Sequence, residues 1–180
     1  MNMKQAGKSP PAHRWRNPIR LVGIVLCGLL LHITVSAQQQ PPRPINIYVS
    51  PVQNLNFGAF FQGAAGGSII VYPNGTRSST GTVIPANFGF TYSPALFEVD
   101  AEPGTIITIL NGPAVTLNGS NGGSMQLTLG TSSPGSPFVG TALSPARNAV
   151  SVGGTLTVGN NMSSPAGDYS GSFTVIFFQQ

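Results

Sequence analysis

The chain has 180 residues, only 7% of which are charged, and its formal net charge is +4. The basic residues are concentrated at the start: five of the eight precede Leu21, whereas all four acidic residues follow Tyr92. From Gln38 onward the chain holds three arginines and four acidic residues, a net charge of −1. Binding to nucleic acid needs a basic patch on the folded domain, so this distribution excludes that class of function.

Residues 1–37 have the three parts of a secretory signal peptide. Basic residues are followed by an apolar run at 21–35, and small residues end at Ala37, which predicts cleavage between Ala37 and Gln38. A membrane span needs about 20 apolar residues, so this shorter run favours a cleaved signal over an uncleaved N-terminal anchor. We therefore expect export to the periplasm, the outer surface or the extracellular space.

Cleavage of this leader would leave a chain without cysteine, histidine or lysine. Cys27 is the only cysteine, and His13 and His32 are the only histidines. The exported part then has no base for a serine or cysteine nucleophile, no histidine or thiolate ligand for zinc, and no disulfide. Carboxylates are then the remaining side chains that could support catalysis or bind a metal.

Three of the four acidic residues alternate along one predicted strand. Glu98, Asp100 and Glu102 are separated by Val99 and Ala101, which is typical of a strand with one wet face. A glycosidase would need two carboxylates flanking a cleft, and no calcium-loop spacing is present. We predict a solvated face here, and a protein that is not an enzyme and uses no metal or cofactor.

The elements after the leader begin with a Gln/Pro-rich arm at 38–44, predicted to be flexible. A single domain at 45–180 follows, in which short β-branched and aromatic runs alternate with Gly, Pro, Asn and Ser. This texture predicts an all-β sandwich or barrel. Strands are predicted at 45–49, 55–59, 68–72, 82–84, 95–101, 105–110, 114–117, 125–129, 148–152, 155–158 and 169–178.

Two local patterns bear on binding. The period of two places Ile45, Ile47 and Val49 on one face of the first strand. Asn74–Gly75 suits a type I′ hairpin turn. The four tyrosines are open to two interpretations, a sugar-stacking platform or strand residues with the ring in the core and the hydroxyl at the rim.

Several motifs, taken in order, resemble a family of bacterial secreted proteins, the domain of unknown function 4402. They include Leu55-Asn-Phe-Gly58, the run from Val71 to Arg77, the run from Pro103 to Ile109, Gly153-Gly-Thr-Leu-Thr-Val158 and the run from Pro165 to Val175. The closing Pro-Ala-Gly-x-Tyr pattern is similar to that of spore-coat-U-like and fimbrial subunits. This resemblance implies an immunoglobulin-like antiparallel β-sandwich with a surface or pilus role. The exported chain lacks the cysteines of those relatives, so their disulfide is not expected.

Two functions are consistent with these observations. The first is an exported, non-enzymatic structural or adhesive protein of the cell surface, similar to a fimbrial subunit. Its Ile45, Ile47 and Val49 strand would pair within its own domain or be donated to the sheet edge of another copy or another surface protein. The alternative is a secreted or periplasmic module that binds a carbohydrate or another ligand, with exposed aromatic residues such as Tyr72 and Tyr92.

Overall fold

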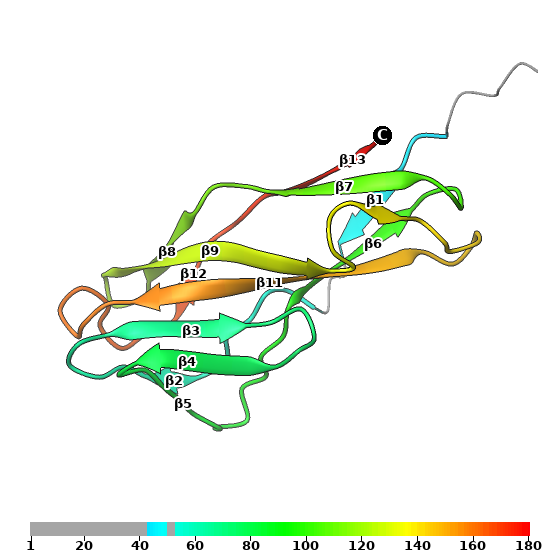
Figure 1. Ribbon diagram of the computed structural model, residues 1–180. Coiled ribbons are helices and arrows are strands. Elements are labelled where there is room, and N and C mark those ends of the chain that lie inside the picture. The colour runs from blue at the N-terminus through cyan, green and yellow to red at the C-terminus, as the bar shows by residue number, and fades with distance from the viewer. Residues whose placement is uncertain (1–42, 50–52) are drawn as a thin grey trace, which may run out of the picture. The chain divides into compact units, whose positions relative to one another are not determined.

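The computed structural model describes residues 43–49 and 53–180, which belong to one compact unit of thirteen strands with no helix (Figure 1). The predicted signal peptide, the Ala37–Gln38 cleavage site and residues 38–42 of the predicted arm lie outside the described residues. The strands are β1 (Asn46–Val49), β2 (Phe60–Phe61), β3 (Gly67–Val71), β4 (Arg77–Gly81), β5 (Ile84–Pro85), β6 (Ala95–Asp100), β7 (Ile106–Asn111), β8 (Val115–Gly119), β9 (Ser124–Ser133), β10 (Phe138–Val139), β11 (Asn148–Val158), β12 (Tyr169–Ser170) and β13 (Val175–Gln179).

The long strand β11 organises the larger sheet. One of its edges pairs with β9 over most of its length, and its other edge pairs first with β6 and then, from Gly154 onward, with β3. The sheet continues from β6 to β1, from β3 to β4, and from β9 through β8 to β12. All of these pairings are antiparallel.

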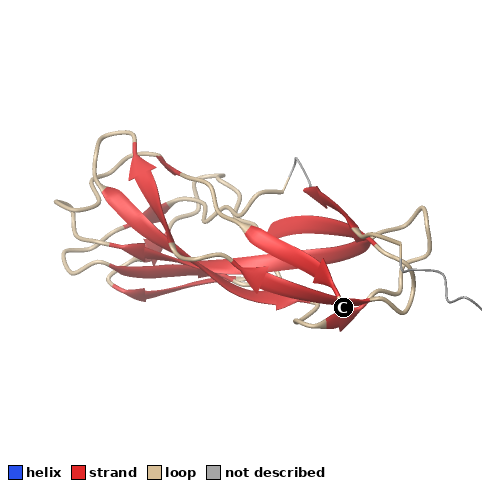
Figure 2. Ribbon diagram, turned by 90° about the horizontal axis from the view of Figure 1, so that it is seen from above, coloured by secondary structure: helices blue, strands red, loops and turns tan. Residues whose placement is uncertain are grey.

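A second layer covers this sheet in two parts. The three-stranded sheet β10-β7-β13 packs against β6 and the first half of β11, and Figure 2 shows the strands in two layers. The centroids of the Phe97 and Phe177 rings lie 5.3 Å apart between these layers. The β2-β5 pair and its flanking segments pack against β3, β9 and the second half of β11. The prediction of an immunoglobulin-like, all-β antiparallel sandwich is confirmed.

Strand β6 shows how the sequence pattern produces this arrangement. Ala95, Phe97 and Val99 are buried, whereas the alternating Leu96, Glu98 and Asp100 are not. Successive side chains of a strand point to opposite faces, so the apolar set faces the second layer and the charged set faces solvent. Phe97 and Val99 then join Val150 and Val152 of β11 in one core cluster.

Residues 55–59, predicted as a strand, form only an isolated bridge between Asn56 and Ser93. The carbonyls of Phe57 and Ala59 accept hydrogen bonds from the Arg77 side chain, and the carbonyl of Ala59 also accepts one from the amide of Ala86. The segment is therefore held by isolated backbone hydrogen bonds to Ser93 and Ala86 and by the Arg77 side chain, and not by a regular ladder.

Other strand boundaries also differ from the prediction. The two strands predicted at 148–152 and 155–158 are one strand, β11, with an irregularity between Val152 and Gly154. The strand predicted at 169–178 divides into β12 and β13, which pair with β8 and β7. The strands at 60–61, 77–81 and 138–139 were not expected, because β2 and β10 have two residues each and β4 is polar throughout.

The predicted type I′ turn at Asn74–Gly75 is wrong. That turn type needs positive φ at both central residues. Only Gly75 has it, at 80°, and no non-glycine residue among the described residues has positive φ. The amide of Gly75 donates to the carbonyl of Tyr72, and the Asn74 side chain accepts from the amide of Thr76, so the loop between β3 and β4 is longer than two residues.

Candidate functional site

One side of the sandwich is bordered by two unpaired strand edges. β1 ends the larger sheet beyond β6, and β13 ends the second sheet beyond β7. Within the described ranges, neither strand has a partner on its other side. Because Phe177 of β13 packs on Phe97 of β6, the partner strand of β1, both free edges border the same side.

The register identifies which main-chain groups of β13 are free. The amide of Gln180 donates to the carbonyl of Ile106, and the amide of Gly112 donates to the carbonyl of Thr174. In an antiparallel ladder these hydrogen-bonded pairs alternate with pairs that point away from each other. The N–H and C=O groups of Val175, Phe177 and Gln179 therefore point away from β7, toward the free edge.

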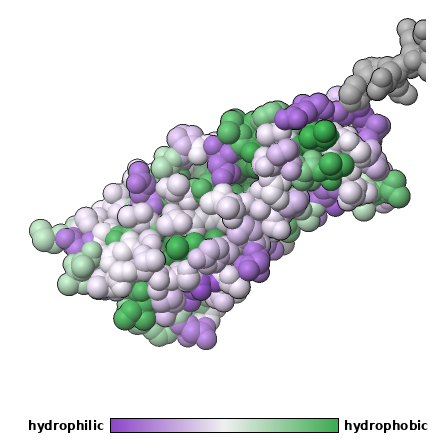
Figure 3. Space-filling view, viewed as in Figure 1, coloured by the Kyte–Doolittle hydropathy of each residue, from purple (hydrophilic) through white to green (hydrophobic). Residues whose placement is uncertain are grey.

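The outer face of the same small sheet is apolar. Ile176 and Phe178 of β13 are 48% and 42% exposed, and Leu110, the partner of Ile176 on β7, is 54% exposed. Ile106 and Val139, which pair with each other, extend the stripe to β10. Figure 3 shows hydrophobic residues gathered over the region of β7 and β13. Exposed apolar stripes of this kind, next to an open strand edge, are typical of interaction surfaces.

The residues of the predicted assembly strand lie at this open side. Ile45 is half-buried and packs on the core beneath β13. Ile47 is the register partner of the fully buried Val99 and so faces inward, yet it is 43% exposed. Val49 is the register partner of Phe97. The strand thus pairs with β6 of its own domain and leaves its other edge, and Ile47, uncovered.

The acidic residues of β6 form ion pairs on its outer face. Glu98 accepts from Arg147 at 2.9 Å, and Asp100 accepts from Arg43 at 3.0 Å, with Glu102 at 3.9 Å from the same guanidinium. The hydrogen bond to Glu98 raises the pKa of Arg147, whose guanidinium also lies over the Tyr48 ring. No three His, Cys, Asp or Glu side chains of the described ranges gather as a metal site would require.

The four tyrosines lie in separate surroundings. Tyr48 lies under Arg147 on β1, Tyr92 lies under Arg77, and the hydroxyl of Tyr72 bonds to that of Ser78. Tyr169 donates its hydroxyl hydrogen to the carbonyl of Pro165, and burial raises its pKa. In the described part of the chain, the aromatic ring pairs are Phe61–Phe88 and Phe97–Phe177, and neither includes a tyrosine.

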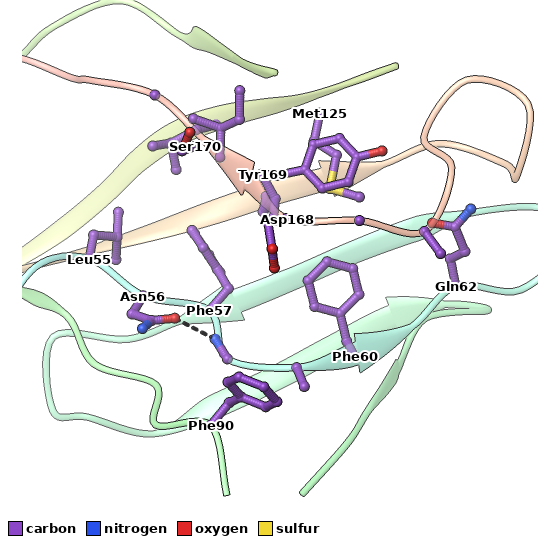
Figure 4. Close-up of a pocket in the computed structure, with 18 of the residues that line it drawn as sticks. Leu55, Asn56, Phe57, Phe60, Gln62, Phe90, Met125, Asp168, Tyr169 and Ser170 are labelled. Carbon is purple, nitrogen blue, oxygen red and sulfur yellow. Dashed lines mark hydrogen bonds between the residues drawn. The ribbon is translucent and has the colours of Figure 1, made fainter. Parts of the chain in front are cut away.

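The other half of the sandwich contains a cleft of about 790 Å³, which we call the aromatic cleft. It lies between the segment 54–62 and the segment 165–173 of the covering layer (Figure 4). Side chains of the larger sheet line its base, and its walls combine aromatic side chains with polar and small residues. The residues that define it are Phe57, Phe60, Phe90, Met125, Leu127 and Tyr169.

Two residues whose roles no sequence pattern indicated shape this region. Arg77 donates to the carbonyls of Phe57, Ala59 and Ala86 at 2.9, 3.1 and 3.2 Å, which fastens the irregular segment to β4. Asp168 points its carboxylate into the aromatic cleft between Phe57 and Phe60 (Figure 4). An arginine in a polar strand and an aspartate in a Pro-Gly turn carry no signal of either role.

The fold and the open side define the class of this protein as an all-β sandwich domain with an unpaired strand edge. Residues 47–177 match the family described as Domain of unknown function (DUF4402), and the chain belongs to that family. The comparisons with curated proteins and with solved structures gave no match. Among the residues that the structure describes, no helix is long and apolar enough to cross a membrane.

Proposed function

We propose that this protein is an exported structural or adhesive subunit of the bacterial cell surface. Its copies would associate by adding a strand at the open side between β1 and β13. The observation that carries the proposal is the free edge of β13, where Val175, Phe177 and Gln179 present three N–H and three C=O groups without a described partner. A main-chain edge of this kind is a template for another strand.

The side chains around this edge support the same proposal. Natural edge strands are commonly guarded by charged residues, especially lysine. β13 reads Val-Ile-Phe-Phe-Gln and has no charge, and no lysine follows Lys8 in the sequence. A strand added beside β13 would pair its backbone and cover Ile47, the inward-facing residue that is now 43% exposed.

A proline at Gln179 tests the proposal. The amide of Gln179 points toward the free edge, so proline there removes one donor for an added strand and leaves the hydrogen bonds to β7 in place. We expect the exported protein, recovered from the envelope fraction, to sediment as oligomers and to form filaments or aggregates in electron micrographs. Gln179→Pro should sediment as a monomer with a melting temperature close to that of the unsubstituted protein.

Ser79→Pro is the matched control. By the same alternation, the amide of Ser79 points away from β3 at the polar free edge of β4. This variant should still assemble. Assembly of Gln179→Pro at the level of the unsubstituted protein, or a monomer in all samples at millimolar concentration, would contradict strand addition at β13.

A further inference from the structure

The aspartate and glutamate side chains of the described residues are paired with cations, with one exception. Glu98 has Arg147, and Asp100 and Glu102 share Arg43. The remaining arginine, Arg77, binds main-chain carbonyls and the ring of Tyr92. Within the described ranges, Asp168 has no cation and its carboxylate accepts no hydrogen bond. This carboxylate is also the one that points into the aromatic cleft (Figure 4).

The backbone holds Asp168 in this position. Its amide donates to the hydroxyl of Ser120 at 3.0 Å, and its carbonyl accepts from the amide of Ser120 at 2.8 Å. The next residue, Tyr169, is tied to Pro165 through its hydroxyl and packs on the core. The turn therefore presents the exposed side chain of Asp168 from a fixed main chain, so a ligand would need to order the side chain but not the backbone.

The surroundings of the carboxylate select the chemistry of the ligand. Phe57 and Phe60 flank it in Figure 4, and Met125 and Leu127 of the larger sheet also line the cleft. A neutral apolar ligand would cover an unpaired carboxylate, which costs free energy, and an anion would be repelled. A cation would pair with the carboxylate and be attracted by the faces of the aromatic rings.

We propose that the aromatic cleft binds an organic cation, with an ammonium group at the carboxylate of Asp168 and an apolar stem against Phe57, Phe60 and Met125. The volume of about 790 Å³ lies within the range of sites that enclose small molecules. The site is in the half of the sandwich away from β13, so it is independent of strand addition. The ammonium group can come from a small amine or from a lysine side chain of another protein.

The test is an NMR titration of the isotope-labelled protein with 2-phenylethylamine and with its neutral analogue, 2-phenylethanol. The amine should shift the amide signals of residues 57–60 and 168–170 and should bind at least tenfold more tightly than the alcohol. Asp168→Asn should weaken binding of the amine at least tenfold and leave the affinity for the alcohol unchanged. Glu102→Gln, which removes an exposed carboxylate outside the cleft, should bind the amine as the unsubstituted protein does.

A third probe, a short peptide with one lysine, separates the two sources. Binding of the peptide tighter than that of the amine assigns the ammonium group to a partner protein, and the reverse order assigns it to a small molecule. Equal affinity for amine and alcohol overturns the proposal. The absence of shifts with all three probes at millimolar concentration does so as well. A response to a neutral saccharide that survives Asp168→Asn would overturn it in favour of glycan binding.

Discussion

Replacing Arg77 with alanine should lower the free energy of unfolding by about 3 kcal/mol, a large part of the stability of a domain this size. The side chain donates to three main-chain carbonyls, those of Phe57, Ala59 and Ala86. A hydrogen bond from a charged donor contributes about 1.5–3 kcal/mol, and the partial exposure of the site reduces the sum. Alanine would leave the carbonyls of Phe57 and Ala86 without their side-chain donor and loosen the segment that packs on the core residues Ile69, Leu127 and Leu156.

Urea unfolding of Arg77→Ala, Arg77→Lys and Arg147→Ala measures this effect. Lysine should recover only part of the lost stability, because an ammonium group cannot reproduce the planar fork that reaches three carbonyls. Arg147 is the matched control: like Arg77 it covers a tyrosine ring, but its other partner is a carboxylate on the exposed outer face. Exposed pairs contribute little, so its removal should leave the unfolding midpoint almost unchanged. An equal loss from both alanine variants would show that Arg77 does not fasten the segment.

Replacing Gly153 with alanine should also lower the free energy of unfolding by about 3 kcal/mol. Gly153 is buried in β11 between the part of the strand that pairs with β6 and the part that pairs with β3. A methyl group there would lie 2.4 Å from the carbonyl oxygen of Val71 and 3.0 Å from Cδ of Pro73. Neither neighbour is the end of a flexible side chain, so the central sheet itself would have to move.

Gly130→Ala on β9, the strand that pairs with β11, is the control for Gly153→Ala. The atoms nearest to an added methyl group at Gly130 are 3.5 Å away, an ordinary contact distance. Alanine there should be neutral or slightly stabilising, because it restricts the unfolded chain. Calorimetric melting of the two variants gives the comparison, and similar melting temperatures would contradict a close backbone approach at Gly153.

The sequence predicts the β architecture well where the core pattern is regular. The alternation at 95–101 and 125–129 corresponds to β6 and β9, because a strand with one buried face must repeat every two residues. The motif order also identified the family, which the match over residues 47–177 confirms. The pattern was less informative at 55–59, where the apolar residues are buried by an irregular segment.

For the candidate sites too, local spacing predicted some features and left others to the tertiary structure. Ile45, Ile47 and Val49 were recognised as one face of a strand from their spacing alone, and they lie in or next to β1. Whether that strand pairs with its own domain depends on β6, about fifty residues away in the chain, and no local pattern encodes this choice. The same is true of the free edge of β13, which exists because no described strand lies beyond it.

The composition by itself determined which side chains were available: no cysteine, histidine or lysine after residue 37, and four carboxylates. The residue types and their local period of two also determined that the fold is all-β. Only the tertiary structure decided that three carboxylates meet arginines on the surface while Asp168 points into an aromatic cleft. The reason is that the surroundings of a side chain are set by segments distant in the chain, and their positions depend on the register of the whole sandwich.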